Sequence, residues 1–197
     1  MNIKAADVKE LRAKTNAGMM DCKKALQETN GDLSKAVDLL RKKGLSLAGR
    51  KSSRVAKEGL IDSYIHLGNK VGVMVEINCE TDFVARNEVF QRFVKDIMLQ
   101  IASASPICIR REDVPAELIE KEKDIARAQI KGKPENIIEK ILEGKINKYY
   151  SDVCLLDQPF VKENGTTIEE LLKSKIAEIG ENIVIKRFVR FQLGEEI

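Results

Sequence analysis

Apolar residues recur along this chain at two different spacings, and each spacing predicts a different element. Across residues 71–77 they alternate with other residues, which is typical of a strand with one buried face. Across residues 89–101 they recur three and four positions apart, which is typical of an amphipathic helix. Residues 76–87 join these two segments and carry one large aromatic side chain, Phe83. The pattern therefore predicts a strand-to-helix junction at the centre of the fold.

Before residue 45 the pattern predicts three short helices, over residues 6–14, 20–29 and 33–43. Turns are predicted at residues 15–18 and at Asn30-Gly31, because asparagine and glycine tolerate turn geometry. Asp32 is expected to cap the third helix and Gly44 to end it. We therefore expect a three-helix module over residues 1–45. Residues 46–58 lose the apolar period and gain serine, glycine and basic residues, which predicts a linker, with a partly helical linker as the alternative.

The remaining residues, 59–197, are expected to form a single α+β domain. Gly59 opens a β-hairpin that turns at Gly68-Asn69. Two helices then form a helical hairpin, the first capped by Asp113 and ended by Lys131-Gly132-Lys133. A helix near residues 167–179 and a strand over residues 183–193 complete the chain. The predicted core is a small, mainly antiparallel sheet packed by helices.

The junction itself has two interpretations. Phe83 lies seven positions before Phe90, in phase with the apolar face of the helix, and would then belong to the core. Asp82 would cap that helix, because a carboxylate there accepts backbone N–H groups. Alternatively, a rigid junction holds Phe83 on the surface and aims it at a partner. The local pattern alone favours the core interpretation.

Charge is unevenly distributed along the chain. The net charge is +3, but residues 1–57 contain 14 Lys and Arg against 6 Asp and Glu, whereas the remainder is acidic. A basic module is compatible with a nucleic acid or with an acidic protein surface. Arg50, Lys51, Arg54 and Lys57 of the linker lack interleaved aromatic residues for base stacking, so a solvated linker is favoured over a phosphate-binding one.

The chain lacks the residue patterns of the common catalytic and metal sites. Four cysteines lie far apart, without a C-x-x-C pair, and His66 is the single histidine, so neither a zinc site nor a nucleophilic triad is expected. Phosphate-binding glycine loops are also absent from the sequence. We therefore expect a binding protein with no metal and no cofactor, rather than an enzyme, and reduced cysteines.

The longest apolar runs are far shorter than the ~20 residues of a membrane helix. The N-terminal residues resemble neither a secretory signal nor a transit peptide. We therefore expect a cytoplasmic protein of bacterial type, with no membrane partner; an organellar form is the alternative.

Three separated stretches resemble the elongation factor Ts family. Residues 11–26, which read LRAKTNAGMMDCKKAL, resemble its N-terminal signature. Residues 76–87, which read EINCETDFVARN, resemble its second signature. Residues 144–161 are similar to a C-terminal part of the same family. The three matches occur in order and span most of the chain.

This resemblance implies a guanine-nucleotide exchange factor for elongation factor Tu, in both its GDP-bound and nucleotide-free states. The N-terminal module would be ubiquitin-associated-like and would dock on the partner. The contact residues implied there are Leu11, Arg12, Gly18, Met19, Met20 and Lys23. Thr81, Asp82 and Phe83 would form a tip that enters the partner near its Mg²⁺ site, with Phe83 as a wedge. Tyr64 and His66 would form a second contact at the tip of the β-hairpin.

The resemblance also implies an assembly state. Longer relatives carry two related half-cores, whereas this chain has room for one, and some short relatives are homodimers. We therefore expect a homodimer that makes no direct contact with nucleic acid. The alternative from another class is an RNA- or ribosome-binding protein that uses the basic N-terminal module.

Overall fold

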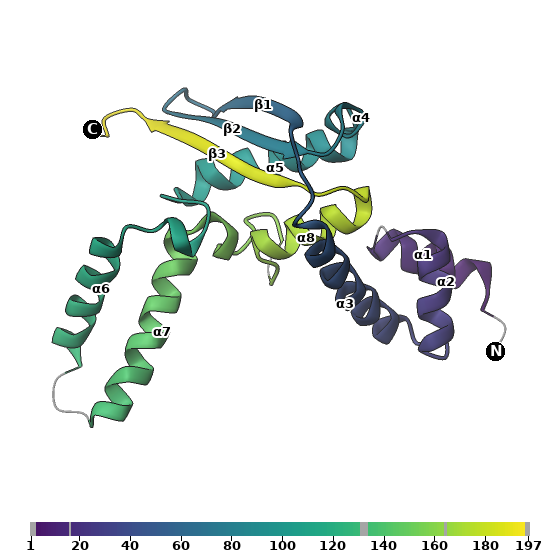
Figure 1. Ribbon diagram of the computed structural model, residues 1–197, viewed down its shortest axis with the longest axis horizontal. Helices are drawn as coiled ribbons and strands as arrows, with labels where there is room; N and C mark the ends of the chain where they lie inside the picture. The colour runs from purple at the N-terminus through teal and green to yellow at the C-terminus, as the bar shows by residue number, and fades with distance from the viewer. Residues whose placement is uncertain (1–2, 16, 131–133, 164, 196–197) are drawn as a thin grey trace. The chain divides into compact units, whose positions relative to one another are not determined.

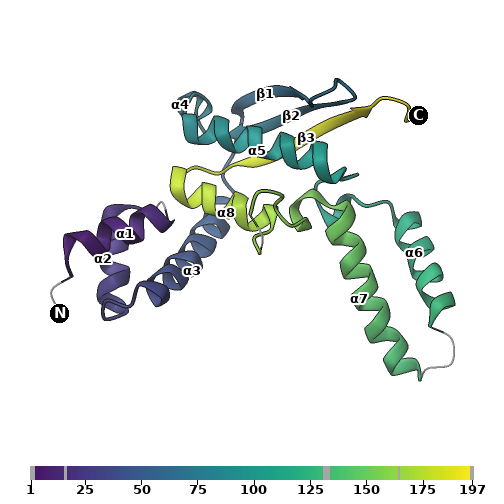
Figure 2. The same cartoon turned by 180° about the vertical axis from the view of Figure 1, so that it is seen from behind.

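The computed structural model describes residues 3–15, 17–130, 134–163 and 165–195, and Figures 1 and 2 show it from opposite sides. The predicted helix break at Lys131-Gly132-Lys133, and Asn16 of the first predicted turn, lie outside these residues. The described residues form helices together with one small sheet, whose strands lie within residues 58–79 and 184–192, and this confirms the α+β prediction.

The first three helices are α1 (Ala5–Thr15), α2 (Met19–Glu28) and α3 (Leu33–Lys51). Their inward side chains form one core cluster, which comprises Val8, Leu11, Cys22, Ala25, Leu26, Ala36 and Leu40. Asp32 caps α3 as predicted, because its carboxylate accepts the Lys35 N–H at 3.0 Å.

The prediction that Gly44 ends the third helix is wrong, because α3 continues for seven more residues to Lys51. A Cβ atom added at Gly44 would lie 3.3 Å from the Cβ of Ala177 on helix α8 (Ile168–Ile179), so a larger side chain would crowd this close approach. Arg41 of α3 also forms an ion pair with Glu170 of α8 at 2.6 Å. This glycine therefore marks close helix packing rather than a helix end, and α3 includes part of the predicted linker.

Three strands of the described chain form one sheet in the order β1-β2-β3. Their bounds are Glu58–Ile65, Val71–Cys79 and Val184–Gln192. The predicted hairpin turn is present, with Asn69 in the left-handed region at a φ of 56°. Leu193 N–H donates to the Lys70 carbonyl at 2.8 Å, so the end of β3 lies beside the start of β2 and the two strands are antiparallel.

The predicted helix after β2 is interrupted. A single turn, α4 (Asp82–Ala85), precedes the long helix α5 (Glu88–Ala104). Asn87 starts α5, because its side-chain oxygen accepts the Val89 N–H at 2.8 Å. The apolar stripe of α5 is buried as predicted, and it consists of Phe90, Phe93, Val94, Ile97, Met98 and Ile101.

Helices α6 (Ala116–Gln129) and α7 (Glu135–Val153) lie side by side, as Figures 1 and 2 show. The predicted helical hairpin is thus present. Its first cap differs from the prediction, because Pro115 occupies the N-cap position of α6 while Asp113 ends a short 3₁₀ helix, Arg111–Asp113. A second 3₁₀ turn, Leu155–Asp157, follows α7.

Two buried glutamines fasten the end of α5 to the segment that follows α7. Gln100 Nε2 donates to Gln158 Oε1 at 3.0 Å, and Gln158 Nε2 donates to the carbonyls of Asp152 and Ala104 at 2.9 and 3.3 Å. Gln100 Oε1 accepts the Val161 N–H at 2.9 Å. Both side chains are therefore satisfied, as buried amides must be.

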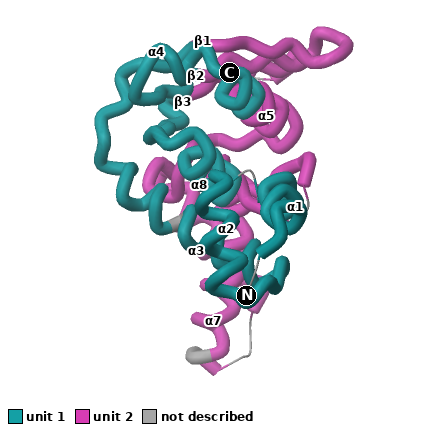
Figure 3. Tube along the Cα trace, turned by 90° about the vertical axis from the view of Figure 1, so that its right-hand side faces the viewer, with its two compact units in different colours: residues 1–60, 76–93, 170–186 teal, residues 61–75, 94–169, 187–197 magenta. Residues whose placement is uncertain are grey.

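Two compact units divide the chain, and Figure 3 colours them separately. Residues 1–60, 76–93 and 170–186 form unit 1, and residues 61–75, 94–169 and 187–197 form unit 2. Unit 1 contains the core of the three N-terminal helices together with Ile77, Cys79, Phe90 and Phe93. Buried residues of unit 2 include Val73, Val75, Ile97, Leu155 and Ile168.

Substituting Gly59 by alanine tests how strictly the start of β1 is specified. Gly59 has a φ of +138°, and a Cβ atom there would lie 2.7 Å from Asn78 Cα and also strike the Ile77 carbonyl oxygen. We expect Gly59→Ala to lower the free energy of unfolding by at least ~2 kcal/mol. Urea denaturation followed by circular dichroism measures this.

Gly49→Ala is the matched control, because Gly49 lies within α3 and its added Cβ would meet nothing within 4 Å. Alanine there should stabilise the helix by about 0.5–1 kcal/mol. A Gly59→Ala protein with an unchanged unfolding midpoint would contradict the clash.

Candidate functional site

Phe83 projects from the single turn α4 with 82% of its surface exposed. The core interpretation of Phe83 is therefore wrong. Its physical reason is the break between α4 and α5, where Asn87 starts a new helix and the phase relation with Phe90 is lost. An exposed phenylalanine held on a short, capped turn is a candidate contact residue.

Thr81, rather than Asp82, is the N-cap of α4. Its hydroxyl oxygen accepts the Val84 N–H at 3.4 Å, and its backbone is extended, as an N-cap requires. Asp82 instead lies in the first turn, where a negative charge is favourable, and pairs with Arg86 at 3.1 Å. Both partners of this pair are largely exposed, so it adds only about 0.3–0.5 kcal/mol.

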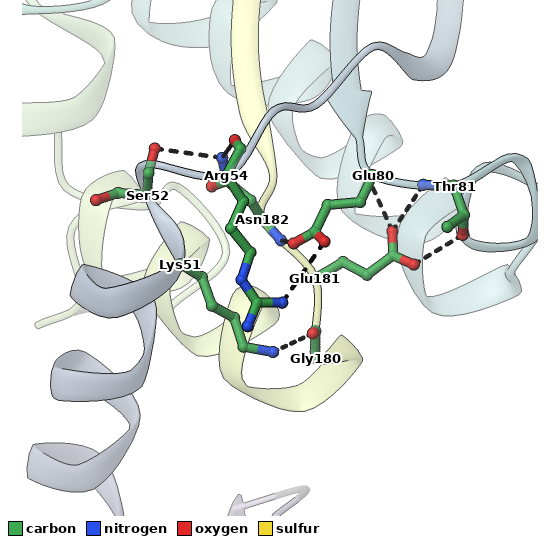
Figure 4. Close-up of polar contacts among 8 residues, drawn as sticks. All are labelled: Lys51, Ser52, Arg54, Glu80, Thr81, Gly180, Glu181 and Asn182. Carbon is green, nitrogen blue, oxygen red and sulfur yellow. Dashed lines mark hydrogen bonds and ion pairs between the residues drawn. The ribbon is translucent and has the colours of Figure 1, made fainter.

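The Glu181 carboxylate holds the start of this turn from the loop between α8 and β3. Its Oε2 accepts the backbone N–H groups of Glu80 and Thr81, both at 3.0 Å. Its Oε1 accepts the Thr81 hydroxyl at 2.7 Å (Figure 4). Three hydrogen bonds thus converge on one carboxylate that lies about 100 positions away in the sequence.

A second polar contact runs from Glu80 to the end of α3. The Glu80 carboxylate accepts the Asn182 N–H at 2.6 Å and pairs with Arg54 at 3.6 Å. Asn182, which is 2% exposed, donates through its side chain to the carbonyls of Arg54 and Ser52 at 2.8 and 3.4 Å. Lys51 Nζ donates to the Gly180 carbonyl (Figure 4). Two cations of the predicted basic linker therefore make intramolecular contacts.

Cys79 is a structural part of the same turn. Its thiol is buried and donates to the Thr81 carbonyl at 3.1 Å. Burial raises the pKa of this thiol to about 11, and the nearby negative charge of Glu181 adds to the rise. The thiol therefore stays protonated at neutral pH and keeps its hydrogen bond.

The predicted contact residues of the N-terminal module do not all lie on its surface. Leu11 is fully buried in the three-helix core, because it faces inward from α1, and the expectation that it contacts a partner is wrong. Met19 and Met20, at the start of α2, are 44% and 62% exposed. Arg12, Gly18 and Lys23 are exposed as well. These five residues are available to a partner.

The tip of the β1–β2 hairpin holds Tyr64 and His66 together. The Tyr64 hydroxyl lies 2.9 Å from His66 Nδ1, and the two rings meet edge to face with centroids 5.9 Å apart. His66 is exposed and Tyr64 half-buried. The pair is a fixed surface feature.

Within the described ranges, no three His, Cys, Asp or Glu side chains come together as a metal ion would require. None of the helices there is both long and apolar enough to cross a membrane.

Glu181 and Asn182 are the site residues that sequence reasoning missed. Both follow Gly180, which the pattern predicts only as a helix end. Their hydrogen bonds reach residues about 100 positions earlier, so no local spacing indicates them.

Comparison with known proteins places these features in one family. A sequence model described as Elongation factor TS matches residues 2–195. The Elongation factor Ts of Geobacter sulfurreducens is 61% identical over 197 residues, covering 99% of this chain and 91% of that protein. The Elongation factor Ts of Thermodesulfovibrio yellowstonii is 59% identical over 196 residues, covering 99% of this chain and 98% of that protein. The chain therefore belongs to the elongation factor Ts family.

Proposed function

We propose that the protein promotes the release of GDP from elongation factor Tu and its exchange for GTP, by inserting the Thr81-Asp82-Phe83 tip near the phosphate and Mg²⁺ site of that GTPase. The exposure of Phe83 on a capped turn is the observation that carries this proposal. The protein would act in the cytoplasm, during the elongation stage of protein synthesis. It would itself perform no covalent chemistry and need no cofactor.

The energy for release would come from differential binding. A GTPase holds GDP through backbone amides, a lysine and Mg²⁺ on the phosphates. If the tip fits only a distorted phosphate site, its binding weakens GDP binding, and GDP weakens the tip by the same factor. Burying one phenylalanine side chain contributes about 1.5–3 kcal/mol, which corresponds to a shift of roughly 10- to 100-fold. GTP then displaces the factor.

Docking would come from the N-terminal module. Met19 and Met20 expose flexible, polarizable side chains at the start of α2, and such side chains suit a protein contact. Arg12 and Lys23 add positive charge on the same module. We retain residues 1–45 as the docking module, with Leu11 supporting its core rather than the contact.

The hairpin tip would make a further contact with elongation factor Tu. Tyr64 and His66 are held together by their hydrogen bond, so binding them costs little conformational entropy. The affinity of His66→Ala for elongation factor Tu tests this assignment, and an unchanged dissociation constant would remove it.

A homodimer would form through the outward face of the sheet. Ile61 and Ile65 of β1 and Met74 of β2 are exposed, although they belong to a sheet whose other face is buried. Val189 and Phe191 of β3 are exposed and alternate with half-buried residues. These five side chains carry no charge, so the face complements a second copy of itself. A patch of this kind is unusual on a monomer.

Phe83→Ala tests the wedge. The fold should remain intact because the side chain is exposed, while the maximal rate of GDP release should fall roughly 10- to 100-fold. Stopped-flow fluorescence of labelled GDP bound to elongation factor Tu measures the rate. Ile107→Ala, which truncates an exposed apolar residue outside the proposed contacts, is the control. Unchanged release by Phe83→Ala would refute the wedge.

Replacing both Met19 and Met20 by glutamate tests docking. The two methionines are exposed in the free protein and would be buried in the complex. Glutamates at these positions would therefore lose their hydration on binding, so the dissociation constant for elongation factor Tu should rise by at least ~10-fold. The release rate at saturating factor should be nearly unchanged. Titration calorimetry with nucleotide-free elongation factor Tu measures affinity. The control replaces Met19 and Met20 by leucine, which keeps the apolar volume, and this variant should bind normally. A double glutamate variant that binds as well as the unmodified protein would count against the docking role.

Phe191→Asp tests the dimer. A charge on the apolar sheet face should be buried without a partner in the dimer, which should raise the dimer dissociation constant at least ~100-fold. Sedimentation equilibrium at micromolar concentration measures the assembly. Val161→Asp places the same charge on an exposed apolar position outside the sheet and should leave the dimer intact. A monomeric unmodified protein would show the proposal to be wrong.

A further inference from the structure

We propose that Glu181 is a positioning residue for the exchange reaction, which fixes the start of α4 so that Phe83 is presented in one orientation. The inference rests on the proposed wedge role of Phe83. It adds a residue outside the tip, from the loop between α8 and β3, to the machinery of exchange.

Glu181 satisfies the backbone N–H groups at the tip. The N–H groups of Glu80 and Thr81 lie between the end of β2 and the first turn of α4, where neither a strand nor a helix partner is at hand. One carboxylate oxygen accepts both N–H groups at 3.0 Å. Hydrogen bonds to a charged acceptor are stronger than neutral ones, so this junction is fixed from outside its own sequence.

Glu181 also orients the Thr81 side chain that caps α4. The Thr81 hydroxyl donates to Glu181 Oε1 at 2.7 Å, which directs the oxygen lone pairs elsewhere. The Thr81 hydroxyl oxygen in turn accepts the Val84 N–H at 3.4 Å. Because α4 is only one turn long, its geometry depends on this cap more than that of a long helix would. Phe83 lies within that turn, two residues after Thr81.

Glu181 is itself held in place by its neighbour in the chain. Asn182 follows Glu181 and is almost fully buried, with its backbone N–H bonded to Glu80 and its side chain bonded to the carbonyls of Arg54 and Ser52. The anchor and the turn are thus linked in both directions, as Figure 4 shows. A ligand-facing residue supported in this way keeps its orientation before binding, which lowers the entropic cost of insertion.

Four variants of the full chain test the proposal with elongation factor Tu and labelled GDP. Glu181→Ala removes all three hydrogen bonds and should lower the maximal release rate at least ~10-fold, with little change in the half-saturating factor concentration. Glu181→Gln should retain most of the rate, because its carbonyl accepts both N–H groups and its amide donates to Thr81. Glu178→Ala, which breaks an ion pair with Lys175, is the control and should leave the rate unchanged. If Glu181→Ala does not fold, Glu181→Met replaces it.

A double-mutant cycle with Phe83→Ala separates positioning from general stability. If Glu181 acts through Phe83, removing Glu181 should have no further effect once Phe83 is alanine. Amide hydrogen exchange gives an independent reading, since the Glu80 and Thr81 N–H groups should exchange faster in Glu181→Ala than in Glu178→Ala.

The outcomes distinguish the wedge role of Phe83 from the positioning role of Glu181. The positioning role is supported if Glu181→Ala slows GDP release only while Phe83 is present, if Glu181→Gln restores the rate, and if the N–H groups of Glu80 and Thr81 exchange faster. A slow Phe83→Ala with an unaffected Glu181→Ala overturns the positioning role alone. Additive effects overturn it as well, because Glu181 would then act independently of Phe83. Normal release by Phe83→Ala overturns the proposed wedge and the role of Glu181 in exchange together.

Discussion

The contact between Glu181 and the turn at Thr81 is the constraint on which the presentation of Phe83 depends. A large apolar side chain in water is ordinarily free to fold back onto the nearest core, and here that core contains Phe90 and Phe93. The chain prevents this by ending one helical turn at Ala85 and starting another helix at Glu88. Three hydrogen bonds that the Glu181 carboxylate accepts then hold the first turn in place. The exposure of Phe83 is thus specified by polar contacts rather than by local periodicity.

Sequence reasoning predicted the elements whose signals are local. The alternation along β2, the Gly68-Asn69 turn and the stripe on α5 all follow from spacing, and the structure confirms them. The errors have two physical causes, which are contacts between segments distant in the sequence and local side-chain caps that compete with the helical pattern. Gly44 was predicted as a helix end because glycine often ends helices, whereas it stands inside α3 beside Ala177 of α8, a neighbour far away in the sequence. Glu181 as an anchor likewise depends on contacts about 100 positions apart. Thr81 as cap and Phe83 as a surface residue depend instead on local hydrogen bonds, from the Val84 N–H to Thr81 and from the Val89 N–H to Asn87, which the apolar period does not reveal.

The choice between exchange factor and RNA-binding protein depends partly on what the basic residues do. Non-specific nucleic-acid binding needs several cations free to approach phosphates, and its affinity falls steeply with salt. Lys51 instead donates to the Gly180 carbonyl, and Arg54 pairs with Glu80 in the network beside the tip. The contacts of these two cations brace the protein itself. These two cations of the predicted linker therefore have a structural use, whereas the nucleic-acid alternative rests on the basic N-terminal module as a whole.

The hydrogen bonds around Glu181 also order the turn that carries Phe83. Asp82 and Arg86 form only an exposed pair, which contributes little, so α4 does not hold itself. The order of α4 comes from its N-cap Thr81, which precedes Phe83 in the chain, and from Glu181, which accepts the Thr81 hydroxyl. This leaves the aromatic face of Phe83 exposed, so in the proposed complex the full value of burying that face would be available. Such burial would accelerate GDP release only if it is gained when GDP is displaced, because a ligand shifts an equilibrium only by its differential affinity for the two states.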